Sequence, residues 1–239
     1  MTVDSIVISG QFNGPPASAN GGYAAGVLAQ ELGAETVEAT LRAPPPLDVP
    51  LRIERAKDGT ARMLYEDALI IEARPSDLDV TADVPAPVTW EEAVAAAKLY
   101  PGLTNHPFPT CFTCGTERGP GDGLRLFTGA VAGREVVASA WEPGVWTAAD
   151  DGSVTPAITW AALDCPGAWA MGFSKEQRAL LGRLTARILI APRAGERYVV
   201  SGWRLGEDGR KMFSGTALFG TDGTLHAAAR AVWIRVESF

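Results

Sequence analysis

TPAITWAALDCPGAWAMGF, residues Thr155–Phe173, is a run of small and apolar residues that contains a single acid, Asp164. Thr155 followed by Pro156 is typical of an N-cap and the first helical position, so the run predicts a helix. Asp164 then lies more than two turns inside that helix, which is not a capping position. Because an unpaired buried charge costs free energy, this acid needs a partner or a chemical task.

Two interpretations of Asp164 stay open. Pro166 would clash with the carbonyl of Ala162 in a continuous helix, so it can break the helix and leave Asp164 as the cap of a second segment that starts at Cys165. Alternatively, a kink at Pro166 places the carboxylate in an apolar cleft whose wall includes Trp160. Burial there would raise the pKa of the carboxyl group toward the range that suits a general base.

The same order of elements occurs twice along the chain. SANGGYAAGVLAQELG predicts a helix from Asn20 to Leu32 that ends at Gly33. Alternating runs over residues 35–74 predict strands after it, with a turn at residues 57–59, as runs over residues 184–236 do after Thr155–Phe173. Two landmarks recur about 150 residues apart, which indicates an internal duplication. These are Ala43-Pro44 with Ala191-Pro192, and Asp58-Gly59 with Asp208-Gly209.

A long connection rich in Pro and Gly separates the two copies. Thr89 and Glu92 form a capping-box pattern, which predicts one helix that runs up to Pro101. The stretch at residues 123–143 alternates as strands of the second copy. We therefore expect an N-terminal unit over residues 1–85, a connecting segment over 86–120 and a C-terminal unit over 121–239.

Composition excludes several classes of function. A net charge of −7 and a pI near 4.9 argue against a nucleic-acid binder, because such a domain carries a basic patch. The sequence shows neither a signal peptide nor a membrane-spanning apolar run, so we expect a cytoplasmic protein. Three cysteines are an odd number, which argues against a disulfide framework and favours reduced thiols or a metal site.

A small apolar helix followed by long antiparallel strands resembles the hotdog fold. Two copies in one chain look like the double-hotdog acyl-CoA thioesterases of the type II class, and NGGYAAGVLA and WAALDC carry the likeness. The resemblance implies an α+β tandem hotdog fold, each half a central helix wrapped by an antiparallel sheet. It also implies acyl-CoA hydrolysis with Asp164 activating water. In that class a threonine and a glutamine assist the aspartate; here Thr185 is the one candidate threonine, and the final strand AARAVWIRV has no glutamine.

The helix start at Asn20-Gly21-Gly22 is the second candidate site. Glycines there let a ligand approach the backbone, and the N–H groups of Gly22 and Tyr23 could hold a developing oxyanion while Asn20 orients the thioester carbonyl. The alternative is a plain Asn cap followed by glycines that pack tightly under the sheet.

Cys111 and Cys114 have the two-residue gap of a zinc knuckle, and His106 lies five residues before them. His106, with Cys165 or a water molecule, could complete a structural zinc site, whereas plain packed cysteines are the alternative. Hydrolysis itself needs no organic cofactor. The other histidine, His226, is expected to be structural or at the surface.

Arg210 and Lys211 follow the Asp208-Gly209 turn and could pair with a phosphate of coenzyme A, although charges beside a hairpin turn are usually solvated. The sequence thus favours an acyl-CoA hydrolase that uses Asp164. A non-catalytic hotdog-like protein that binds acyl-CoA or another apolar ligand, and an acyl-thioester hydratase or dehydratase, are the alternatives. Open sheet edges make further self-association plausible.

Overall fold

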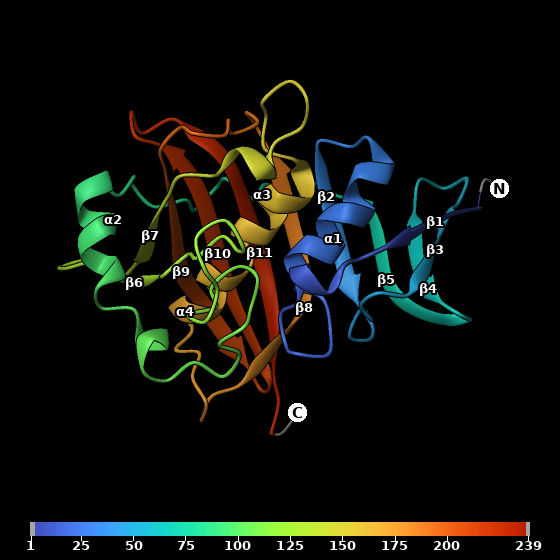
Figure 1. Cartoon of the computed structure of the whole chain (residues 1–239), viewed down its shortest axis with the longest axis horizontal. Coiled ribbons are helices and arrows are strands. Elements are labelled where there is room, and N and C mark those ends of the chain that lie inside the picture. The colour runs from blue at the N-terminus through green and yellow to red at the C-terminus, as the bar shows by residue number, and fades with distance from the viewer. Residues whose placement is uncertain (1–2, 238–239) are drawn as a thin grey trace.

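Strands form one continuous antiparallel sheet in the computed structural model, which describes residues 3–237 (Figure 1). Within these residues the sheet has 11 strands in the order β1-β3-β4-β5-β2-β8-β11-β10-β9-β7-β6. The strands are β1 (Val3–Val7), β2 (Thr36–Leu41), β3 (Pro50–Arg55), β4 (Ala61–Tyr65), β5 (Ala68–Pro75), β6 (Gly129–Ala130), β7 (Val137–Trp141), β8 (Ala179–Ile188), β9 (Tyr198–Asp208), β10 (Lys211–Gly220) and β11 (Leu225–Arg235).

Five strands follow one another in the same order on each side of the centre of the sheet, and β6 is an additional edge strand beyond β7. β2 pairs with β8 at the centre, with Thr36 opposite Arg187. Outward from that pair the order is β2-β5-β4-β3-β1 on one side and β8-β11-β10-β9-β7 on the other. The turns at Asp58-Gly59 and Asp208-Gly209 join β3 to β4 and β9 to β10, so the repeated landmarks occupy corresponding places. The order of elements expected from the sequence is confirmed.

Four α-helices accompany the sheet in the described part of the chain: α1 (Gly21–Ala29), α2 (Trp90–Ala97), α3 (Pro156–Ala162) and α4 (Cys165–Ala170). α1 lies over the N-terminal half of the sheet, and α3 and α4 lie over the C-terminal half (Figure 1). α1 continues as a 3-10 turn over Gln30–Leu32 and ends at Gly33, whose φ of 61° is left-handed. The predicted helix from Asn20 to Leu32, with its terminal glycine, is therefore confirmed.

The second helical run is broken. α3 ends at Ala162 and α4 begins at Cys165, and Asp164 between them has φ −78° and ψ −83°. Pro166 explains the break, because a proline inside a helix removes a hydrogen bond and clashes with the preceding turn. Of the two chain paths that the sequence left open for Thr155–Phe173, the structure shows the interrupted one.

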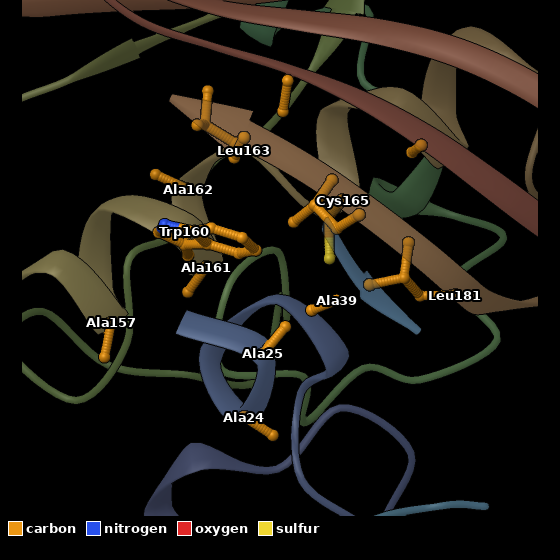
Figure 2. Packing of buried hydrophobic residues seen from close by; sticks show 14 of the residues in the cluster. Ala24, Ala25, Ala39, Ala157, Trp160, Ala161, Ala162, Leu163, Cys165 and Leu181 are labelled. Atoms are coloured by element: carbon orange, nitrogen blue, oxygen red, sulfur yellow. The ribbon is translucent and has the colours of Figure 1, made fainter. Parts of the chain in front are cut away.

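α1 packs on α3 at backbone contact (Figure 2). A Cβ on Gly22 would lie 2.6 Å from the Asp164 Cβ, and one on Gly26 would lie 2.7 Å from the Trp160 Cβ. Such distances are closer than side-chain carbons tolerate, so these two glycines, one helical turn apart on one face, permit the approach. This contact brings the start of α1 to the break between α3 and α4.

The connecting segment supplies an outer layer. Thr89 and Glu92 form the expected capping box of α2, although the helix ends at Ala97 rather than near Pro101. α2 packs on β7 and β9 at the edge of the sheet (Figure 1), where it covers Val199. The stretch at residues 123–143 forms only the short strands β6 and β7, so the expectation of strand along its whole length is wrong. Among the described residues, the helices are too short or too polar to cross a lipid bilayer.

Candidate active site

Asp164 lies at the break between α3 and α4 and is 3% exposed. Its Oδ2 accepts hydrogen bonds from Asn20 Nδ2 at 2.8 Å and from the backbone N–H of Gly22 at 3.0 Å. Its Oδ1 is buried and has no hydrogen-bond partner within residues 3–237. Although Asp164 occupies the N-cap position of α4, its side chain makes no capping bond. The capping interpretation is therefore wrong, and the carboxylate instead belongs to the start of α1.

The environment of Asp164 shifts its protonation. Burial raises the pKa of its carboxyl group to about 7. The nearby Cys111 also raises this pKa, whereas the hydrogen bonds from Gly22 and Asn20 lower it. Burial dominates because an ionised carboxylate loses water there and gains only two donors. A carboxyl group with such a pKa can both accept and return a proton near neutral pH.

The start of α1 holds Asp164 and does not lie free for a ligand. Asn20 caps the helix by accepting from the Tyr23 N–H at 2.8 Å, and its amide nitrogen donates to Asp164. The N–H groups of Gly22 and Tyr23, predicted as oxyanion donors, are thus both engaged. The N–H of Gly21 has no acceptor in the described part of the chain, and Gly21 lines the cavity beside Asp164. Of the N–H groups at this helix start, that of Gly21 is therefore the one without an acceptor at the cavity.

An apolar cavity of about 230 Å³ opens at this point; we call it the α1 cavity. Asn20, Gly21 and Asp164 line it together with the three cysteines. Its apolar walls come from both halves of the chain and include Leu41, Phe108, Phe173, Leu181, Trp233 and Ile234. Sequence patterns did not single out these wall residues, because they come from strands and loops distant in sequence. Its volume and apolar lining suit a short apolar chain with a polar end at Asp164.

A second cavity, the α3 cavity, lies at the start of α3 and has a volume of about 390 Å³. Its lining includes Gln30, Glu35, Pro156, Trp160 and Ile188. Trp160, expected in the wall beside Asp164, lines this second cavity and is absent from the lining of the first. The side chain instead packs on Gly26 of α1, one turn beyond the glycine that contacts Asp164.

The three cysteines meet on the floor of the α1 cavity. All three are buried, and their sulfur atoms lie within 4.8 Å of one another. His106 does not reach them with a ring nitrogen: Nδ1 accepts from the Phe108 N–H at 2.9 Å, and Nε2 lies 3.1 Å from the Cys114 carbonyl oxygen. The structure thus brings Cys165, rather than His106, to the CxxC pair.

Hydrogen bonds and burial shift the pKa values of the three thiols in different directions. Hydrogen bonds from the Cys114 and Cys165 thiols lower the pKa of Cys111 well below its ordinary value. Burial raises the pKa of Cys114, and the hydrogen bond with Cys111 raises that of Cys165.

Other predicted site residues lie elsewhere. Arg210 and Lys211 are exposed at the β9–β10 turn and are absent from the lining of the α1 cavity. Thr185 is buried in β8, opposite Glu38 of β2. The described lining of the α1 cavity contains neither a threonine nor a glutamine. His226 lies in β11, with Nδ1 3.1 Å from the Ile190 carbonyl oxygen, as expected of a structural residue.

Solved structures resemble the whole chain. The tesB protein of Mycobacterium avium subs paratuberculosis covers 98% of this chain and 93% of its own length, at 12% identity and a TM-score of 0.62. A conserved protein of unknown function with a hot dog fold from Alicyclobacillus acidocaldarius covers 99% of this chain and 94% of its own length, at 10% identity and a TM-score of 0.58. The fold is a hotdog fold. Acyl-CoA thioesterase II TesB2 of Mycobacterium marinum covers 84% of this chain and 80% of its own length, at 12% identity and a TM-score of 0.52.

The resemblance to double-hotdog thioesterases is thus confirmed at the level of the fold. At these identities the likeness shows the fold and leaves the reaction to the site itself. No protein-family model matches the sequence, and no curated protein matches it.

Proposed function

We propose that this protein hydrolyses acyl-CoA thioesters in the α1 cavity. The observation that carries the proposal is a buried carboxylate, Asp164, whose Oδ2 is fixed by Asn20 and Gly22 while Oδ1 has no partner in the described chain. Fixing one oxygen and leaving the other free is what a general base needs. The apolar walls would bind the acyl chain, and the structurally similar TesB2 of Mycobacterium marinum is described as an acyl-CoA thioesterase II.

The reaction follows from these positions. Asp164 Oδ1 takes a proton from a water molecule as the water oxygen attacks the thioester carbonyl carbon. The Gly21 N–H would stabilise the oxyanion that forms, as a free donor at a helix start can. The C–S bond then breaks, Asp164 returns the proton to the leaving sulfur, and the products are a carboxylic acid and the free thiol of coenzyme A. None of these reaction steps needs an organic cofactor.

The proposal includes the division of the chain. Two hotdog units, residues 1–85 and 121–239, share one sheet across the β2–β8 pair, and residues 86–120 connect them. The matching strand order on the two sides supports an internal duplication. Asp164 of the second unit and Asn20 of the first would then form one site between the units.

A second candidate is a binding protein that holds acyl-CoA or another apolar ligand without turnover. The observation that favours it is the lining of the α1 cavity, in which the described residues include no threonine or glutamine to assist Asp164 in placing water. Hydrolysis then depends on Asp164 alone for that task.

A panel of acyl-CoA thioesters of increasing chain length, assayed with a free-thiol reagent, separates the two. We expect thiol release that saturates with substrate and yields one carboxylic acid for each thiol. Saturable binding by calorimetry with no thiol release above the uncatalysed rate would instead establish the binding protein. Formation of a hydroxyacyl-CoA or enoyl-CoA product would assign the hydratase or dehydratase reaction.

A further inference from the structure

Three buried sulfur atoms form one group that the hydrolytic reaction does not use. Cys111 and Cys114 come from the connecting segment, and Cys165 is the first residue of α4. Their exposed fractions are 3%, 1% and 8%. The three sulfurs lie within 4.8 Å of one another, and Cys111 Sγ is 3.7 Å from Cys165 Sγ. Residues distant in sequence thus converge on one point.

The spacing of the sulfurs fits a tetrahedral zinc ion. With Zn–S bonds of about 2.3 Å, two sulfurs of a tetrahedral site are about 3.8 Å apart. Cys111 and Cys165 already have this separation, and the Cys114 sulfur lies within 4.8 Å of both. A disulfide, by contrast, needs an S–S bond of about 2.0 Å.

The backbone holds the CxxC turn in a tight conformation. Gly115 N donates to the Cys111 carbonyl oxygen at 2.8 Å, and a Cβ on Gly115 would lie 2.5 Å from that oxygen. The glycine after the second cysteine therefore closes a turn too tight for a side chain. Hydrogen bonds outside the coordination shell fix the positions of metal ligands in this way.

We propose that Cys111, Cys114 and Cys165 bind one Zn²⁺ ion as three thiolates, and that the fourth coordination position faces the α1 cavity. Binding releases the protons of the three thiols and places a divalent cation among the negative charges, which lowers the cost of burying them. All three cysteines line the cavity, so a water molecule from it can complete the tetrahedron.

His106 does not supply the fourth ligand. Its Nδ1 accepts from the Phe108 N–H, and its Nε2 faces the Cys114 carbonyl oxygen. Ring contacts with Tyr100 and Trp169, with centroids 6.0 and 5.2 Å away, hold the imidazole in this orientation. The role of His106 is to fix the loop that carries Cys114.

The ion would join the connecting segment to the start of α4, next to Asp164. It would thereby hold the floor of the α1 cavity, whether the cavity hydrolyses a thioester or only binds a ligand. The zinc site and the hydrolytic reaction can therefore fail independently.

Metal content tests the site directly. Protein purified without a histidine tag is expected to hold about one zinc per chain by mass spectrometry, as a structural zinc site does. Cys111→Ser, Cys114→Ser and Cys165→Ser should each lose most of it, whereas His106→Gln should keep it. Zinc well below one equivalent in the wild-type protein, or loss of zinc in His106→Gln with retention in Cys165→Ser, would overturn the assignment.

Two measurements on the wild-type chain remain informative if the serine variants do not fold. X-ray absorption should show three sulfur ligands at about 2.3 Å and one oxygen at about 2.0 Å. Alkylation of the three thiols should release the zinc, with release tracking thiol modification. A nitrogen in the fourth position would overturn the open coordination position, and a Cys111–Cys165 disulfide in metal-free protein would overturn the zinc site altogether.

Discussion

The α1 cavity and the α3 cavity lie at corresponding helix starts and differ in the groups that those helix starts present. The α1 cavity begins at Asn20 and Gly21, and the break in the opposite helical run delivers Asp164 to it. The α3 cavity begins at Pro156, which has no N–H to offer, and the opposite helix, α1, ends there in the 3-10 turn Gln30–Leu32 and Gly33 without a buried acid. Its one carboxylate, Glu35, is exposed and pairs with Arg187.

The difference shows how one copy of a repeated fold can be specialised. A buried carboxylate with a free oxygen requires a helix break on one side and a glycine-rich helix start on the other. Pro166 supplies the break and Gly21-Gly22 supply the start, and the α3 cavity has neither feature. We therefore expect chemistry at the α1 cavity alone.

The largest contrast is expected from the carboxylates. Asp164→Asn keeps an oxygen to accept from Asn20 and Gly22 but cannot accept a proton, so kcat should fall by about 10²- to 10⁴-fold. Glu35→Gln in the α3 cavity should leave kcat within about twofold, because that side chain is exposed and solvated. Thiol release under saturating acyl-CoA measures both. Wild-type turnover in Asp164→Asn would remove this residue from the mechanism.

The two glycines of the helix contact separate packing from chemistry. Gly22→Ala and Gly26→Ala each place a methyl group within 3 Å of neighbouring atoms, so each should lower the free energy of unfolding by about 1–3 kcal/mol. Of the two glycines, only Gly22 contacts Asp164, and a methyl group there would displace the Asp164 side chain, so only Gly22→Ala should also reduce kcat beyond the loss of folded protein. Denaturant titration and single-turnover assays supply the two numbers. Equal kcat losses in the two variants would indicate that packing alone is responsible.

Wall residues should affect specificity in one cavity only. Leu181→Val lengthens the α1 cavity by about one methylene, so the ratio of kcat/KM between neighbouring acyl lengths should shift about tenfold toward the longer chain. Ile188→Val makes the same change in the wall of the α3 cavity and should leave the ratio unchanged. A changed kcat/KM ratio in the Ile188→Val variant would indicate that the acyl chain binds in the α3 cavity, which would contradict the proposal.

The helix caps give the smallest contrast. Asn20 accepts from the Tyr23 N–H, whereas Thr155 makes no side-chain capping bond. Asn20→Ala should cost about 0.5–2 kcal/mol of stability, and Thr155→Ala should cost less than about 0.5 kcal/mol. Because Asn20 also holds Asp164, its variant should lower kcat at unchanged KM, and Asn20→Asp, which caps equally well, should not restore it. Thermal unfolding and steady-state kinetics check both caps, and a Thr155 variant as unstable as Asn20→Ala would contradict the comparison.

Much of the fold followed from local patterns. Helix caps at Asn20 and Gly33, the capping box at Thr89 and the two Asp-Gly turns depend on residues close in sequence, which is why periodicity and turn chemistry predicted them. Asp164 was also recognisable, because a single acid in an apolar run stands out in the sequence wherever the helix begins or ends.

The partners of Asp164 were not predictable in the same way. Its hydrogen bond from Asn20 spans 144 positions and depends on how closely Gly22 and Gly26 let two helices approach. Trp160 was assigned to the wrong cavity. A helical pattern predicts which residues share one face of the helix, but it does not predict which part of the protein packs against that face. For the CxxC pair the sequence suggested both His106 and Cys165, and only the folded chain shows that Cys165 lies beside the pair while the His106 nitrogens face other groups.

A crystal structure with a ketone analogue of acyl-CoA, in which a methylene replaces the thioester sulfur, tests the central claim most directly. The account predicts the acyl chain within the α1 cavity, the ketone oxygen at the Gly21 N–H, and a water molecule between Asp164 Oδ1 and the carbonyl carbon. An acyl chain in the α3 cavity, or a carbonyl group that no water bridges to Asp164, would contradict it.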